Sequence, residues 1–126
     1  MQLKLWDDTT YTIMKFPAHV EIPTSFHEIL GFKSIAYTKD ECSIIVPTNT
    51  LPTEQALSVD NNWFIIQIAG ELDFSLVGIL TQLANPLAEN QISIFALSTY
   101  NTDYLLIKNK DKDKAIHVLK NCGHTF

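Results

Sequence analysis

Hydrophobic residues follow two different spacings along residues 63–90. Residues 63–69 form an almost continuous apolar run, interrupted only by Gln67, and this is typical of a central strand covered on both faces. Apolar residues then recur at three- and four-residue intervals, which predicts a helix that begins within residues 73–75 and runs toward Asn90. The apolar stripe of this helix comprises Leu76, Ile79, Leu80, Leu83 and Leu87.

The remainder of the second half predicts two more strands and a helix. One strand is expected at residues 92–97 and the next at residues 104–107, with a polar turn between them at residues 98–103. The final helix is expected to open at Asn109 or Asp111. It should end at Gly123, because glycine after a helix adopts the left-handed conformation without steric cost.

The first half predicts short strands separated by turns. Its strands are expected at residues 3–6, 11–16, 32–38 and 42–46. A polar turn at residues 7–10 separates the first two strands. Ser25 and Glu28 have the spacing of a capping box and predict a short helix that ends at Gly31. A second short helix is expected at residues 53–59, close to the boundary between the halves.

The order of elements predicts an internal duplication. The second half gives strand, helix, strand, strand, helix and lacks a closing strand, whereas the first half has an extra strand, residues 3–6, before the same order. We therefore predict an α+β chain with two ferredoxin-like (βαββαβ) units, residues 1–60 and 61–126, each an antiparallel sheet with helices on one face. The strand at residues 3–6 is expected to pair with the sheet of the second unit.

Composition favours a soluble protein that does not bind nucleic acid. The 126 residues carry a net charge of −5 and include no arginine, so the sequence lacks a clustered basic surface and a guanidinium clamp for phosphate. No apolar run approaches the roughly 18 residues that span a bilayer. Residues 1–8 hold acids where a signal peptide would be apolar. We expect a cytoplasmic protein without membrane association, and reduced thiols at Cys42 and Cys122.

Patterns for metal binding and nucleophilic catalysis are weak. His117, Cys122 and His124 lack the paired spacing of a zinc site, and the other histidines are scattered. Cys42 lies in a predicted strand, without the helix N-terminus or basic partner that activates a thiol. We therefore predict no metal, no cofactor and no catalytic residue.

Several separated blocks of the sequence resemble ACT-domain proteins. The blocks are GELDFSL, LANPLAE, ISIF and STYNTDY, at residues 70–76, 83–89, 92–95 and 98–104. The resemblance is to the branch that contains small bacterial ACT proteins and the cytosolic CASTOR-type arginine sensors, and it extends from residue 63 to about residue 123. It implies a regulatory module that binds an amino acid between paired domains and is not itself catalytic.

The resemblance also implies where a ligand would lie. Contacts are expected at three places in the second half of the chain. These are the loop that precedes the helix beginning within residues 73–75, the end of that helix, and the strand and turn that follow it. On this sequence they are Leu72, Asp73, Phe74, Ser75, Glu89, Asn90, Gln91, Ile92, Ser93, Ile94, Thr99, Tyr100 and Asp103. One residue departs from the family pattern, because glycine is usual where this chain has Gln91. A side chain there would narrow or fill the pocket.

The chemistry of these residues suits an amino acid but has a structural explanation as well. Free backbone N–H groups at the start of the helix that begins within residues 73–75 can donate hydrogen bonds to a ligand carboxylate, and the helix dipole favours the negative charge there. Asp73, Glu89 and Asp103 are candidates for an ammonium group, which hints at a basic amino acid. The structural explanation is that Asp73 or Ser75 caps the helix and Asp103 is a turn residue.

Three functional hypotheses follow. The first is a cytoplasmic amino-acid-binding regulatory protein that works as a homodimer, with the ligand held where two second-half units meet. The second is an interaction module that keeps the fold and the dimer but has lost the ligand, and Gln91 is its motivating feature. The third, a small enzyme on a ferredoxin-like scaffold, requires an exposed acid paired with a histidine in the pocket.

Overall fold

The computed structural model describes residues 1–73 and 76–126, and the chain divides into two compact units. Unit 1 comprises Met1–Asp8 and Trp63–Phe126, and unit 2 comprises Thr9–Asn62. Two long strands, β1 (Leu3–Phe16) and β4 (Ser58–Ile68), contribute residues to both units. The boundary of each unit therefore falls inside these strands.

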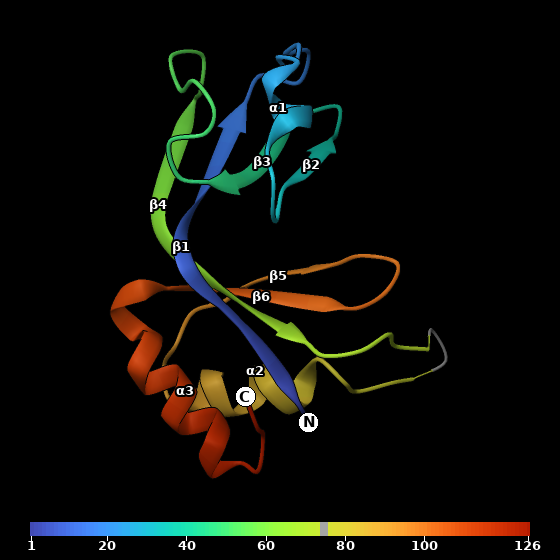
Figure 1. Cartoon of the computed structure of the whole chain (residues 1–126), viewed down its shortest axis with the longest axis vertical. Helices are drawn as coiled ribbons and strands as arrows, with labels where there is room; N and C mark the ends of the chain where they lie inside the picture. Colours follow the sequence, from blue (N-terminus) through green and yellow to red (C-terminus); the bar gives the residue numbers. More distant parts are fainter. Residues whose placement is uncertain (74–75) are drawn as a thin grey trace. The chain divides into compact units, whose positions relative to one another are not determined.

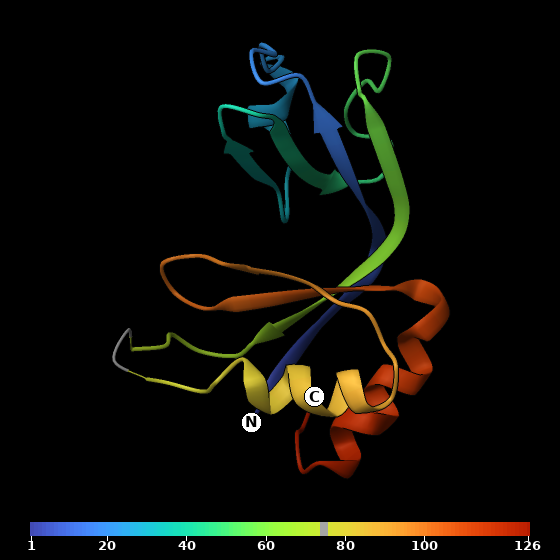
Figure 2. The same cartoon turned by 180° about the vertical axis from the view of Figure 1, so that it is seen from behind.

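Unit 1 is a ferredoxin-like sheet with two helices. After β4 the chain forms α2 (Thr81–Glu89), β5 (Phe95–Ser98), β6 (Asp103–Lys108), a 3-10 turn (Asn109–Asp111) and α3 (Lys112–Asn121). The strand order is β1-β4-β6-β5. The start of β1 lies beside β4 and takes the place of the closing strand that the second half of the chain lacks. The β4–β6 and β5–β6 pairs are antiparallel. Both helices cover one face of the sheet (Figures 1 and 2), and the shared core includes Phe64, Ile66, Leu83, Leu87, Leu105, Ile107 and Leu119.

Unit 2 repeats this strand order with less helix. Its elements after β1 are α1 (Ser25–Glu28), β2 (Ser34–Tyr37) and β3 (Cys42–Pro47), followed by the start of β4. The order β2-β3-β1-β4 again places the last strand beside the first. The core consists of Met14, Phe16, Phe26, Cys42, Ile44, Val46 and Leu51. The described part of unit 2 has no helix between its third and fourth strands.

The strongest sequence patterns predict the observed elements well. The central-strand prediction for residues 63–69 is confirmed, because β4 lies between β1 and β6 and its residues 63–66 are all buried. The strands predicted at residues 32–38 and 42–46 are confirmed as β2 and β3, which form an antiparallel pair. The final helix ends as predicted: Gly123 has φ of +92° and donates its N–H to Lys120, while His124 donates to Leu119. These two hydrogen bonds form a Schellman motif.

The turn predicted at residues 7–10 is wrong, because β1 continues through it. Polar side chains on this stretch find partners without interrupting the strand: Asp7 pairs with Lys112, and the hydroxyl of Thr10 donates to that of Thr48 over 2.9 Å. The backbone of Thr10 accepts from the N–H of Thr48 over 2.9 Å. Threonine is favoured in strands, so an exposed polar stretch is compatible with a continuous strand.

Two helix predictions in the first half also need correction. The capping box does not form, since α1 is four residues long and Thr24, at its N-cap, makes no side-chain hydrogen bond. The helix expected at residues 53–59 is absent, and Ser58 already belongs to β4. Leu57 donates its N–H to the carbonyl of Lys15 over 2.7 Å, so this segment bonds to β1 instead of forming helical bonds.

Candidate functional site

The loop between β4 and α2 is much longer than the sequence pattern indicates. The predicted helix start within residues 73–75 is wrong, because α2 begins at Thr81. Gly78 has φ of +71°, which an α-helix does not accommodate, and Leu76 is half exposed instead of joining the apolar stripe. The helix N-terminus expected beside Leu72 is therefore not there, and the N–H of Leu72 donates to the carbonyl of Asn101 over 2.7 Å.

The turn between β5 and β6 is held against the end of β4. Thr102 is buried and donates its hydroxyl to the carbonyl of Ile68 over 2.9 Å. Within the turn, Thr99 donates its N–H to the carbonyl of Thr102 over 2.9 Å, and the hydroxyl of Ser98 donates to the carboxylate of Asp103. These bonds, with the Leu72–Asn101 bond, fix the turn beside the loop that follows β4.

A hollow of about 200 Å³ lies between this loop and this turn. Its lining consists of Leu72, Asp73, Leu76, Ile79 and residues 98–103. A neighbouring hollow is lined by Glu71, Leu72, Asp73 and Tyr100. The structure therefore brings together five of the residues that the family resemblance implies, namely Leu72, Asp73, Thr99, Tyr100 and Asp103.

The hollow is acidic. Asp73 and Asp103 contribute carboxylates, and neither lysine nor histidine is among its described lining residues. Hydroxyl and amide groups of Ser98, Thr99 and Asn101 supply further oxygen acceptors. Such a lining suits a cationic group and offers no side-chain cation for an anion.

The predicted ligand residues at positions 89–94 lie at or after the C-terminal end of α2, which is about 13.5 Å long at 1.5 Å per residue. Figure 2 shows the segment after α2 at the opposite end of unit 1 from the β5–β6 turn. Glu89 lines a separate hollow with Cys122 and His124. Asn90 and Ser93 are exposed, whereas Ile92 and Ile94 pack in or against the core. Phe74 and Ser75 lie outside the described residues.

Gln91 occupies the position that follows the α2 C-cap and has φ of +60°. Its N–H donates to Ala88 over 3.0 Å, and the N–H of Ile92 donates to Leu87 over 2.9 Å. This is the same Schellman motif that ends α3, with glutamine where α3 has Gly123. The left-handed backbone favours glycine at this position whether or not a ligand is nearby.

Sequence reasoning missed several residues of the hollow. Leu76 and Ile79 were assigned to the helix stripe, and Ser98, Asn101 and Thr102 were treated only as turn residues. A usable signal was present, since a turn with five hydroxyl or amide side chains in six residues is unusually rich in hydrogen-bonding groups.

Residues 1–73 and 76–126 contain neither a metal-binding cluster of side chains nor a membrane-spanning helix. No group of three or more histidine, cysteine, aspartate or glutamate side chains is arranged to hold a metal ion in this range. No helix in this range has the length and apolarity needed to cross a bilayer.

Comparison with protein families gives a match to the second half of the chain. A family model described as ACT domain matches residues 58–121, which include the loop, α2 and the β5–β6 turn. The human protein described as putative protein CASTOR3P is 33% identical over 101 residues, covering 71% of this chain and 62% of that protein. The human cytosolic arginine sensor for mTORC1 subunit 1 is 28% identical over 97 residues. This chain aligns with 30% of that sensor's length.

Solved structures resemble the whole chain. The protein Atu0741 from Agobacterium tumefaciens has 33% identity and a TM-score of 0.87, covering 98% of this chain and 90% of that one. A structure of aspartokinase alpha and beta subunits has a TM-score of 0.63 at 18% identity, covering 97% of each chain. At that identity the likeness concerns the fold alone.

Proposed function

The chain belongs to the ACT-domain family, and on this basis we propose that it is a regulatory module, without catalysis of its own, that binds a free amino acid. The proposed binding site is the hollow that Leu72, Asp73, Leu76 and Ile79 line together with the β5–β6 turn. The observation that carries the proposal is the convergence of Asp73, Tyr100 and Asp103 on one hollow.

The acidic lining supports a ligand with a cationic group. An ammonium or guanidinium can reach the carboxylates of Asp73 and Asp103, and charge-assisted hydrogen bonds of this kind contribute roughly 1.5 to 3 kcal/mol each. The relatives described as cytosolic arginine sensors agree with this preference. The proposal is therefore sharpest for a basic amino acid.

Exposed apolar side chains beside the hollow support a homodimer. Leu76, Val77 and Tyr100 are 50%, 87% and 75% exposed. An amino acid in a hollow of about 200 Å³ would stay partly open to water, and a second copy laid on these side chains would cover it. A ligand that binds the paired state more tightly shifts the chain toward that state, which is how a module of this kind regulates. We include a cytoplasmic location in this proposal.

Thermal shift with each of the twenty amino acids tests the ligand. A ligand at one hundred times its Kd stabilises the native state by about 2.7 kcal/mol, which raises the Tm by on the order of 10 °C. Asp103→Asn should abolish the shift, whereas Asp113→Asn on the exposed part of α3 removes the same charge and should leave it intact. Stabilisation by none of the twenty would count against the proposal.

Light scattering coupled to size-exclusion chromatography tests the dimer. The unmodified chain should give a dimer in the presence of its ligand, and Val77→Lys should give a monomer. Leu30→Lys is the matched control, because Leu30 is as exposed as Val77 but lies in unit 2. A chain that stays monomeric at all ligand concentrations would contradict the shared site.

The alternative function is an interaction module that keeps the fold without a ligand. Gln91 is the specific observation that motivates it, because its side chain stands where the family usually has glycine. If Gln91→Gly converts a chain that binds no amino acid into one that does, the alternative is favoured. If the unmodified chain already binds, the alternative is excluded.

A further inference from the structure

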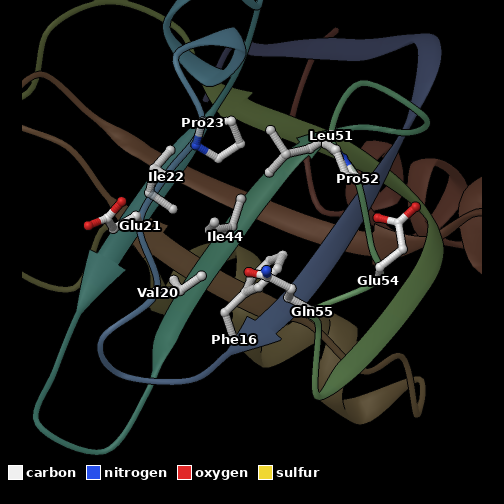
Figure 3. Close-up of a pocket in the computed structure, with 10 residues that line it drawn as sticks. All are labelled: Phe16, Val20, Glu21, Ile22, Pro23, Ile44, Leu51, Pro52, Glu54 and Gln55. Atoms are coloured by element: carbon white, nitrogen blue, oxygen red, sulfur yellow. The ribbon is translucent and has the colours of Figure 1, made fainter.

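Unit 2 contains a hollow of about 370 Å³ on the face of its sheet that carries the core (Figure 3). Phe16 and Ile44 come from β1 and β3, Val20 and Ile22 line one side, and Leu51 lines the other. Phe16, Ile44 and Leu51 are buried members of the unit's core cluster. The volume lies within the range of small-molecule sites, roughly 300 to 1,000 Å³.

The hollow exists because unit 2 lacks a helix that unit 1 has. In unit 1 the third strand, β6, leads into α3, whose Ala115 and Leu119 are fully buried against the sheet. In unit 2 the third strand, β3, leads into residues 48–57, where no helix forms. This segment and the segment after β1 cover the sheet incompletely and leave a space between them.

Hydrogen bonds fix both walls. Val20 donates its N–H to Pro17 over 3.1 Å, and its carbonyl accepts from the hydroxyl of Tyr37 over 3.1 Å. On the other side Leu57 donates its N–H to Lys15 over 2.7 Å. Because hydrogen bonds hold both walls to strands, the hollow is formed in the absence of a ligand. Binding therefore does not include the conformational entropy cost of ordering these walls.

The charges around the hollow are of one sign. Glu21 and Glu54 stand at opposite edges, and the side-chain amide of Gln55 points toward the middle (Figure 3). No lysine, arginine or histidine is in the lining, and neither glutamate makes an ion pair with any residue in the described ranges. An amine would meet carboxylates and an amide oxygen here, whereas an anion would meet no cationic side chain among the described lining residues.

We propose that this hollow is a second binding site, independent of the one in unit 1, for a small organic cation with an apolar body and no carboxylate, such as an aromatic amine. The apolar body displaces water from Phe16, Ile44 and Leu51, and the ammonium lies at a glutamate-bearing edge.

The test is a titration of the full chain with phenethylamine, followed by methyl NMR signals. Phenethylamine should shift the methyl signals of Val20, Ile22 and Leu51, while 3-phenylpropionate, of similar size and opposite charge, should not. Glu21→Gln with Glu54→Gln should weaken binding about threefold or more, and added salt should weaken it in the unmodified chain. Glu28→Gln with Asp113→Asn removes the same number of charges at exposed positions outside the hollow and should have no effect.

Leu51→Trp provides a variant that fills the hollow instead of changing its charge, and it should abolish the shifts at Val20 and Ile22. Failure of phenethylamine to shift any of these methyl signals would overturn the proposal, as would equal binding of 3-phenylpropionate. The amino-acid thermal shift and its dependence on Asp103 are measured separately, so the two sites can fail independently.

Discussion

Replacement of Gln91 by glycine should stabilise the protein. A side chain in the left-handed conformation costs roughly 1 to 2 kcal/mol relative to glycine, and Gln91 has φ of +60°. Relief of this strain by glycine is partly offset, by about 0.4 to 1 kcal/mol, because glycine raises the conformational entropy of the unfolded chain. The expected net gain is about 0.5 to 1 kcal/mol in the free energy of unfolding.

Urea unfolding measures this gain. The midpoint should rise by roughly 0.3 to 0.7 M with an unchanged m-value. Gly123→Gln is the matched reverse change, because Gly123 occupies the same position in the α3 motif with φ of +92°, and it should lower the midpoint by a similar amount. If Gly123→Gln destabilises and Gln91→Gly does not stabilise, backbone strain is not the relevant property of Gln91.

Three further predictions concern buried groups. Thr102→Val should cost about 1 kcal/mol, measured by urea unfolding, because it removes a buried hydrogen bond and leaves a carbonyl unpaired. Leu87→Ala should cost about 2 to 5 kcal/mol by the same assay, because Leu87 is fully buried between α2 and the sheet. Burial raises the pKa of the Cys42 thiol, so a thiol reagent at pH 8 should modify only the exposed Cys122 until the protein unfolds. Rapid modification of two thiols in the native protein would contradict the last prediction.

The predictable part of the fold is the part with strong apolar periodicity. The run at residues 63–69 identifies the central strand because it is almost continuously apolar, as a strand covered on both faces requires, and is too short for a typical buried helix. Gly123 marks the end of α3 because few residues tolerate its backbone conformation. In both cases a local physical constraint acts through one residue type.

The unpredictable part depends on contacts between distant segments. Residues 7–10 have the composition of a turn, and their strand is maintained by partners such as Lys112 and Thr48 that only the folded chain brings near. The apolar spacing before Leu83 suggested helix, yet Gly78 ends the helical register and the loop is instead held by Asn101. Tertiary hydrogen bonds override local pattern at both places.

The candidate site shows the same division. Family resemblance identified residues on the loop and the turn, and five of them line one hollow. It could not establish that the segment after α2 lies a helix length away, because that separation depends on where α2 begins. Whether Glu89 and Gln91 contact a ligand held by a second copy stays a prediction.

The shared long strands make the chain hard to divide. A fragment of residues 61–126 contains almost all of the matched ACT segment, but it lacks residues 1–8 and therefore leaves one edge of β4 without its neighbouring strand. An unpaired, strongly apolar edge promotes aggregation. Expressed alone, this fragment should be insoluble, and a synthetic peptide of the first eight residues supplied in trans should recover it. Fragment complementation of this kind is the behaviour expected of a circularly permuted domain.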